Sequence, residues 1–511
     1  MCDTMRLNEL NNLSAPVPET PSKFKSERNT ADLAMPLPQG IASSKITKIN
    51  WSGLNYRQNL DTGVLSYENN ISTEEAPYLT PSRKRNIYAS GYANPISMFG
   101  FDDFLLIVYS IGSTAYIDYI NAAGNKYTGT LGSSHGNTQR SIVKFNVYDT
   151  PTDPISGNYV QKLLIFPDKK SMDFTITSNF TPANLDSGIN QVPNIQYATV
   201  HLSRLFGVDN DRVYASGFND YSNWNLDTVL EQNTSNAWCS PAQANTKANG
   251  KFTGITTFQN HVICFKRDYM HEIYNNKNPF RIYDIFQEGT IENRSVVDVG
   301  GQLIFTANDG VKVYTGGKPR NIGYYLGADN FTKAVAGTDG RRYYLYCSTE
   351  KKPHNLFVYD TYINQWSEEA VNFEVLGFAK TSTGMYMLGS DGGVYKLDTN
   401  NYTHNWSAET DFYSGSTIDI KHIQKVQMLA DIAAGSTFEA YLLYDGETFN
   451  ASTSHKICSH TNNSGGVQKI PIRVVPRQTA NYCFKLHMNG YGYTKLYQLE
   501  LSVKQGGELF K

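Results

Sequence analysis

Short runs of β-branched and aromatic residues recur through the middle of the chain, and turn sequences separate them. Four such phrases end on a tyrosine, at Tyr274, Tyr314, Tyr359 and Tyr395, so the phrase repeats in steps of 40, 45 and 36 residues. Each phrase holds two or three apolar runs split by turn residues, as in Asn308-Asp309-Gly310, which is the pattern of successive β-hairpins. A hairpin unit recurring at about 40 to 50 residues is typical of a β-propeller, whose four-stranded blades bury their faces on one another.

The same pattern continues upstream with longer insertions between the apolar runs. Residues 104–109, 163–166 and 204–208 are apolar runs of this kind, and each is followed by a second short run. The repeat therefore predicts about seven blades between residues 51 and 405. An irregular all-β sandwich is the alternative, and it is disfavoured because sandwiches have no fixed period near 40 residues.

The two ends of the chain differ from this repeat. Residues 1–50 mix Ser, Thr, Pro, Asn and Lys without a sustained period, which predicts an extended N-terminal arm that becomes ordered only against a partner. Residues 406–511 contain five runs in which apolar and polar residues alternate with period two. That pattern predicts a compact antiparallel β-sandwich at the C-terminus. The expected fold class is all-β throughout.

Composition agrees with an all-β chain and narrows its environment. Aromatic residues make up 13% of the 511 residues, with 35 tyrosines, whereas charged residues make up only 18%. The formal net charge of −2 argues against the broad basic surface that duplex binding requires. No run of 18 apolar residues occurs, so we expect no membrane span. The six cysteines form no C-x-x-C pair, which favours synthesis in a reducing cytoplasm.

The sequence contains none of the common catalytic patterns. There is no G-x-S-x-G elbow, no H-E-x-x-H and no P-loop. Asp102, Asp103, Asp209 and Asp211 offer carboxylates, but each lies in a turn-like context. Asp209-Asn210-Asp211 lacks the further spaced ligands of a calcium loop, and the histidines are scattered. We therefore expect no catalytic residue, no metal site and no cofactor.

The densest basic cluster of the chain is Arg83-Lys84-Arg85, where the first predicted blade begins. One interpretation is a solvated turn. The other is a contact with a neighbouring subunit or with phosphate groups along a DNA path.

Three segments resemble one family of proteins. Residues 51–55, 65–72 and 76–83 are similar to the opening of propeller proteins encoded with the head-to-tail genes of tailed bacteriophages. Residues 203–224 resemble the "R-L-F … R-V-Y-x-S … D-x-x-x-W" phrase of that family, and residues 497–507 are similar to its last strand. The residues that we single out in these segments are Pro77, Tyr78, Arg204, Arg212, Tyr221 and Trp224.

The resemblance implies a structural role in a virion. Members of the family are described as DNA-stabilisation, tail-hub or tail-nozzle proteins. They form a ring, usually of six copies, below the portal and adaptor, and they retain packaged double-stranded DNA and pass it on without sequence-specific binding. By this resemblance the chain is made in the host bacterial cytoplasm and is placed in the virion neck or tail. The family has no catalytic motif to carry over, and the arm of about 50 residues departs from its pattern.

Two other functions stay open at this point. A phage tail adhesin or depolymerase would bind host surface glycans through the propeller, and it would need an aromatic platform beside paired carboxylates. A cytoplasmic propeller that binds other proteins is disfavoured, because the chain lacks a WD-type signature.

Overall fold

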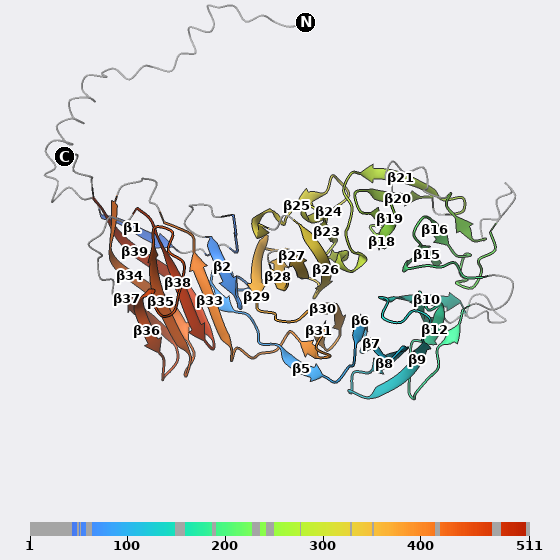
Figure 1. Ribbon diagram of the computed structural model, residues 1–511, viewed down its shortest axis with the longest axis horizontal. Coiled ribbons are helices and arrows are strands. Elements are labelled where there is room, and N and C mark those ends of the chain that lie inside the picture. Colours follow the sequence, from blue (N-terminus) through green and yellow to red (C-terminus); the bar gives the residue numbers. More distant parts are fainter. Residues whose placement is uncertain are drawn as a thin grey trace, which may run out of the picture.

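Nearly every regular element in the computed structural model is a β-strand (Figure 1). The structure describes residues 43–48, 51, 53–57, 64–148, 159–185, 191–226, 236–241, 250–275, 277–327, 330–349, 352–413, 420–472 and 482–506. Helical structure within these ranges is limited to two 3-10 turns, η2 (Asn293–Ser295) and η3 (Tyr324–Leu326). No helix of the described residues has the length and apolar character that a membrane span requires.

Seven four-stranded antiparallel sheets follow one another around a ring, which confirms the predicted propeller (Figure 1). The first blade has the strand order β6 (Pro95–Phe101), β7 (Phe104–Ile111), β8 (Thr114–Ile120) and β9 (Lys126–Gly132), and the second has the order β10 (Ser141–Tyr148), β11 (Tyr159–Phe166), β12 (Lys170–Asp173) and β13 (Ala183–Asn184). The third blade has the order β14 (Tyr197–His201), β15 (Arg204–Val208), β16 (Val213–Ala215) and β17 (Trp238–Cys239), and the fourth has the order β18 (Phe252–Phe258), β19 (His261–Lys266), β20 (Met270–Tyr274) and β21 (Arg281–Phe286). The fifth blade has the order β22 (Val297–Val299), β23 (Gln302–Ala307), β24 (Gly310–Tyr314) and β25 (Arg320–Asn321), and the sixth has the order β26 (Phe331–Thr338), β27 (Arg342–Thr349), β28 (Asn355–Asp360) and β29 (Gln365–Glu369). The seventh blade has the order β30 (Val375–Thr381), β31 (Gly384–Gly389), β32 (Val394–Lys396) and β5 (Asn86–Ala89).

Each pair of neighbouring blades shares a hydrophobic core. Seven clusters of buried residues each take their side chains from two adjacent sheets. Between the fourth and fifth blades, for example, the rings of Phe265 and Phe305 lie 5.1 Å apart between centroids, and both side chains are fully buried. The alternating apolar positions that predicted the hairpins therefore fill the spaces between blades, because each blade presents one face to either neighbour.

The ring closes where the first blade meets the seventh. Strand β5 comes from before the first blade, yet it pairs with β32 as the outer strand of the seventh blade. On the inner side, β6 and β30 approach so closely that a Cβ added at Gly100 would lie 2.3 Å from the carbonyl oxygen of Lys380. Glycine is required at position 100 because a side chain would have no space there. Its backbone conformation is not the reason, since it lies outside the left-handed region.

We predict that Gly100→Ala destabilises the closed ring, because the added methyl group meets backbone that cannot rotate away. Overpacking of this kind costs about 1–3 kcal/mol, so the midpoint of thermal unfolding should fall. Gly317→Ala is the matched control, since nothing lies within 4 Å of its Cβ position. Equal midpoints for the two variants in differential scanning calorimetry would contradict the close approach.

The second unit is a sandwich of two antiparallel sheets. One sheet has the order β1 (Ser43–Lys48), β39 (Thr494–Gly506), β34 (Ile420–Ile432) and β37 (Val467–Ile472), and the other has the order β2 (Leu65–Asn69), β33 (Asn405–Thr410), β38 (Phe484–Tyr491), β35 (Thr437–Tyr444) and β36 (His455–Thr461). Buried residues from both sheets form one core that includes Trp51 and Trp406. This confirms the predicted C-terminal sandwich.

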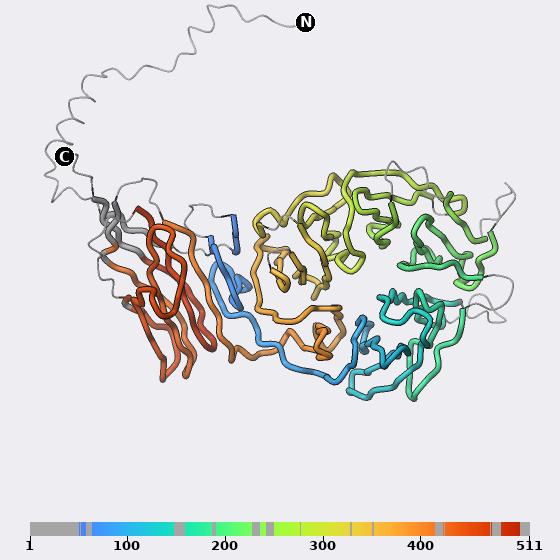
Figure 2. Tube along the Cα trace, viewed as in Figure 1, coloured from blue at the N-terminus to red at the C-terminus, as the bar shows by residue number. Residues whose placement is uncertain are grey.

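The strand pairing differs from the division of the chain at residue 51 that the sequence suggested. Residues 43–48, expected in the arm, form β1 and pair with β39. Strand β2, expected in the propeller, pairs with β33 of the sandwich. The propeller is thus inserted into the sandwich, and the chain leaves and re-enters this unit side by side (Figure 2). Residues 1–42, 49 and 50 of the expected arm lie outside the described residues.

Candidate functional site at the joint

The segment that leads from the sandwich into the propeller crosses the outer edge of the sixth blade. It contains the short strands β3 (Ile71–Ser72) and β4 (Thr80–Pro81). At its start, Asn70 donates its backbone N–H to the carbonyl of Glu368 at 3.0 Å, and its side-chain oxygen accepts from the N–H of Ala370 at 2.8 Å. The Asn70 side-chain nitrogen donates to the carbonyl of Asn405 at 3.0 Å. One residue therefore joins the segment to strand β29 and to the chain that returns to the sandwich.

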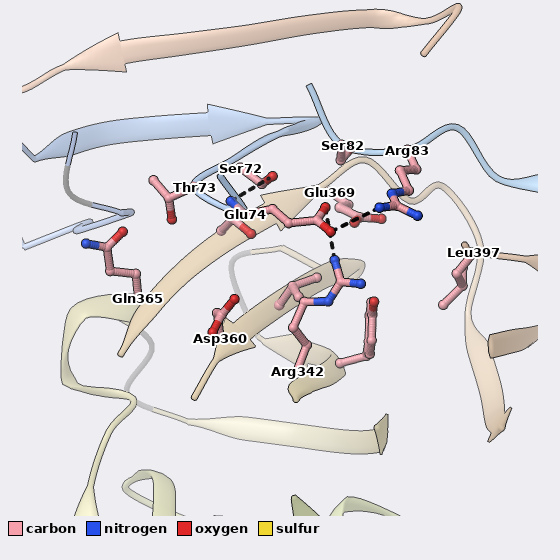
Figure 3. Close-up of a pocket in the computed structure, with 13 residues that line it drawn as sticks. Ser72, Thr73, Glu74, Ser82, Arg83, Arg342, Asp360, Gln365, Glu369 and Leu397 are labelled. Atoms are coloured by element: carbon pink, nitrogen blue, oxygen red, sulfur yellow. Dashed lines mark hydrogen bonds and ion pairs between the residues drawn. The ribbon is translucent and has the colours of Figure 1, made fainter. Parts of the chain in front are cut away.

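A network of charged side chains lies beneath this segment (Figure 3). Glu74 points between two arginines, with Oε1 3.3 Å from Nη2 of Arg83 and Oε2 3.1 Å from Nη1 of Arg342. Arg342 in turn binds Asp339, Nε to Oδ2, at 2.8 Å. Glu74 belongs to the connecting segment and Arg342 to strand β27, so the carboxylate fastens this segment to the propeller.

One acidic partner in the network, Asp339, is held in its charged form. Burial alone would raise the pKa of the Asp339 carboxyl, but Arg342 and the backbone N–H groups of Arg341 and Arg342 outweigh it and hold that pKa below its usual value. Arg341 binds Asp360 at 2.5 Å between Nη2 and Oδ2. The cavity within the network has a volume of about 30 Å³, room for about one water molecule. These residues therefore form an electrostatic joint between the units and leave no space for a substrate.

A larger hollow, which we call the basic pocket, lies beside this joint. It has a volume of about 300 Å³. Its lining comes from the connecting segment, from the end of the sixth blade and from the seventh blade, and consists of Asn70, Ser82, Arg83, Lys84, Arg85, Glu369, Asn372, Phe373, Tyr395 and His404. A pocket of this size matches the lower end of the range for small-molecule sites.

The structure brings the predicted basic cluster to this joint but gives its three residues different roles. Arg83 binds Glu74, and Arg85 donates from Nη2 to the carbonyl of Ala370. Lys84 is exposed, and its backbone N–H donates to the carbonyl of Asn401 at 2.6 Å. Two members of the cluster thus hold the chain in place, while all three line the basic pocket.

Two residues singled out by the phage-like segments lie on the sandwich side of the joint. Pro77 follows a cis peptide bond, and its carbonyl accepts the N–H of Trp51 at 3.2 Å. Tyr78 packs edge-on against Tyr497 with ring centroids 4.9 Å apart, and Lys495 lies 4.8 Å above the Tyr78 ring. These residues fasten the connecting segment to strand β39.

The other four residues of that set lie in the third blade and on its face toward the second. Arg204 is buried and donates from Nη1 to the carbonyls of Ser216 and Asn236 at 2.6 and 2.9 Å. Trp224 is buried in the core shared with the second blade, and Tyr221 packs edge-on against Phe145 of that blade. Arg212 directly precedes strand β16, and its Nη1 lies 3.6 Å from the sulfur of Cys239. Each contact described for this set is structural.

The turn aspartates that were considered as catalytic residues or as calcium ligands also make structural contacts. Asp209 accepts the backbone N–H groups of Asp211 and Arg212, each at 2.7 Å, as turn aspartates commonly do. Asp102 pairs with Lys144 at 3.2 Å, and Asp103 accepts from Ser382. The described residues contain no cluster of three or more His, Cys, Asp or Glu side chains arranged to hold a metal ion.

A buried acidic pair at the joint was missed by the sequence analysis. Glu68 of strand β2 is fully buried and faces Glu368 of strand β29, which binds Lys352 and the Tyr56 hydroxyl. Burial raises the pKa of Glu68 well above its ordinary value, the Glu368 charge raises it further, and a backbone contact with Glu368 opposes them. Alternating strands often carry glutamates on a solvent face, so nothing in the sequence marked this one as buried.

The raised pKa of Glu68 predicts that the joint weakens as the pH rises. Stability from a neutral Glu68 is complete below its unfolded pKa of about 4.5 and is lost as the pH rises through the higher folded pKa. Glu68→Gln stays neutral, so at pH 8 it should be more stable than the parent by on the order of 1–3 kcal/mol, with little difference at pH 4.

Thermal unfolding between pH 4 and pH 8 measures this difference. Asp398→Asn, which changes an exposed carboxyl group, is the control and should follow the parent. A Glu68→Gln variant with the same pH dependence as the parent would show that Glu68 is ionised in the folded protein.

The divided roles of the basic cluster give a second prediction. Arg83→Ser removes a partner of Glu74 and should lower the free energy of unfolding by about 1 kcal/mol. Lys84→Ser changes only an exposed side chain and should stay within about 0.5 kcal/mol of the parent. Chemical denaturation of the two single variants measures both values, and equal stabilities would assign Arg83 to a solvated turn.

Taken together, the fold defines an all-β protein, a seven-bladed propeller inserted into a β-sandwich. No protein-family model matches the chain, and no curated protein matches its sequence. Among solved structures, it is similar to the extracellular domain of a one-component system from B. thetaiotaomicron, at 11% identity and TM-score 0.36, over 82% of this chain and 61% of that one. BamB from Moraxella catarrhalis matches at 11% identity and TM-score 0.33, over 69% of this chain and 100% of that one.

A Trypanosoma rangeli sialidase in complex with sialic acid also matches, at 8% identity and TM-score 0.27, over 91% of this chain and 96% of that one. The chain spans about three fifths of the length of the first of these proteins. Similarities at this level concern the β-propeller fold and carry no information about activity.

Proposed function

We propose that the chain is a structural protein of a tailed-phage neck or tail, acting as a hub, nozzle or connector ring around the DNA path. One observation carries this proposal beyond the resemblance itself. Two of the three resembling segments, far apart in sequence, contact each other through Tyr78 and Tyr497, and Leu79 exchanges backbone hydrogen bonds with Leu496 at 3.2 and 2.8 Å. Segments that resemble one family and also pack together support the interpretation of a single structural unit.

The chemistry of the joint favours a mechanical role over catalysis. Two of the carboxylates gathered there are engaged by cations, Glu74 by two arginines and Glu368 by Lys352. The pairing of Glu74 with Arg342 holds the connecting segment on the propeller, and Tyr78 and Leu79 hold it on strand β39 of the sandwich. This arrangement suits a subunit that must hold its shape while DNA passes. The net charge of −2 agrees with a channel that does not retain phosphates, because dense Lys and Arg would bind them.

Exposed tyrosines near the joint offer contact area for neighbouring copies. Tyr324, Tyr325 and Tyr362 are 56%, 49% and 76% exposed. Tyrosine is enriched at protein interfaces, and a ring needs the same heterologous contact repeated until it closes. In this proposal six copies form the ring, and the portal or adaptor stabilises it.

The assembly prediction follows directly. We expect the purified protein to form or join a closed ring of about six copies, most completely when a portal or adaptor partner is added. Mass photometry and cryo-EM of virions measure the copy number and position. Tyr362→Ser should reduce ring formation without lowering the unfolding midpoint, and Tyr482→Ser, at another exposed tyrosine, is the control. Single copies at fibre tips would contradict the proposal.

A host-glycan adhesin or depolymerase is the second candidate, and one feature favours it. The exposed rings of Tyr274 and Tyr283 lie 5.2 Å apart on strands β20 and β21, and Glu272 beside them binds His261 and the Tyr274 hydroxyl at 2.8 and 2.9 Å. Paired rings beside a carboxylate suit the apolar face and hydroxyls of a sugar. Retention on host surface polysaccharide that Tyr283→Ala abolishes would favour this function over the ring.

A further inference from the structure

Two arginines that line the basic pocket are fixed by contacts on the protein and also carry buried donors. Nε of Arg83 and Nη1 of Arg85 are buried and have no hydrogen-bond partner among the described residues. Both guanidinium groups are nevertheless fixed, since Arg83 binds Glu74 through Nη2 and Arg85 binds the carbonyl of Ala370 through Nη2. A guanidinium group that is already fixed loses little conformational freedom when it binds an oxyanion, so Arg83 and Arg85 are preorganised for one.

The electrostatic environment of the pocket is positive. The pKa of His404 is lowered by burial and, further, by the charges of Arg85 and Lys84, against an opposing contact with the backbone of Asn70. Burial raises the pKa of Glu369, although Arg85 and Arg342 oppose that effect, so its negative charge is disfavoured. Glu369, the one acidic residue among the described residues of the lining, therefore offsets the basic residues weakly, and an anion entering the pocket is attracted.

The remaining lining suits a small polar ring. Phe373 and Tyr395 stack with centroids 5.1 Å apart and an interplanar angle of 15°. Asn70, Asn372 and Ser82 add amide and hydroxyl groups to the same lining. Aromatic carbon beside amides, with cations at one side, matches a hydroxylated ring that carries one acidic group.

We propose that the basic pocket binds a small polar molecule through a single carboxylate or phosphate group, with Arg83, Lys84 and Arg85 as the oxyanion ligands. An acidic sugar has this chemistry, with its ring against Phe373 and Tyr395. A pocket of about 300 Å³ encloses one such group, whereas duplex DNA presents a long row of phosphates to a broad surface. The site is independent of ring assembly and of the Tyr274–Tyr283 pair.

Isothermal titration of the full chain with three matched sugars tests this site. Glucuronate carries a carboxylate, glucose 6-phosphate carries a phosphate, and glucose carries neither. We expect at least one acidic sugar to bind about tenfold or more tightly than glucose, since hydrogen bonds to charged groups exceed those between neutral groups. The comparison of glucuronate with glucose 6-phosphate assigns the oxyanion as carboxylate or phosphate.

Variants distinguish binding in the basic pocket from non-specific attraction to positive charge on the protein surface. Lys84→Gln combined with Arg85→Gln should weaken binding of the acidic sugar about tenfold or more, and Lys318→Gln, at an exposed lysine outside the pocket, should not change it. Because Arg85 also holds the chain at Ala370, Lys84→Glu alone provides a variant that alters only an exposed side chain and should likewise weaken binding.

Three results would overturn the proposal. The first is glucose binding as tightly as both acidic sugars, and the second is unchanged affinity in a folded Lys84→Glu variant. The third is binding of a short duplex DNA in place of either acidic sugar, which would assign the cluster to phosphates of the DNA path.

Discussion

The whole structure depends on one strand pairing that closes the ring of blades. Strand β5 reaches the seventh blade from before the first, so the chain must enter the propeller beside the point at which it leaves. The sandwich strands that flank the insertion, β2 and β33, are held as neighbours for the same reason. A propeller that closes by exchanging a strand joins its last blade to the chain that enters its first, so the ring cannot open there without breaking this pairing.

The joint converts that proximity into a fixed orientation. Asn70 links the connecting segment to the end of strand β29 and to the returning chain at Asn405, and Glu74 links the same segment to strand β27 through Arg342. Ion pairs at a partly buried boundary fix the orientation of the two sides, because each charge loses its partner if one side rotates against the other. The same segment brings Arg83, Lys84 and Arg85 into the lining of the basic pocket, so the crossing that forms the joint also forms the pocket.

The sequence predicted the elements whose signal is local. Alternating apolar runs and Asn/Asp-Gly turns marked the hairpins, the recurrence near 40 residues marked seven blades, and period-two runs marked the sandwich. It did not place β1 and β2 in the sandwich, because a pairing such as Ser43 with Lys504 leaves no periodic trace. For the candidate site it found Arg83, Lys84 and Arg85 by charge density alone. Their partner Glu74 and the Arg342 that also binds it lie far apart in the sequence, and the burial of Glu68 depends on how its strand packs, so only the fold reveals these contacts.

Insertion of the propeller into the sandwich also sets the order in which the chain can fold. Asn70 and Asn405 are hydrogen-bonded across 335 residues, and every residue between them is synthesised before the second can appear. Each blade is built mainly from neighbouring hairpins, which form quickly, whereas the sandwich must wait for strands from both sides of the insertion. On the ribosome, β1 and β2 therefore emerge long before their partners and stay unpaired until the chain is nearly complete. The sandwich can therefore complete its strand pairing only after strand β39 has been synthesised.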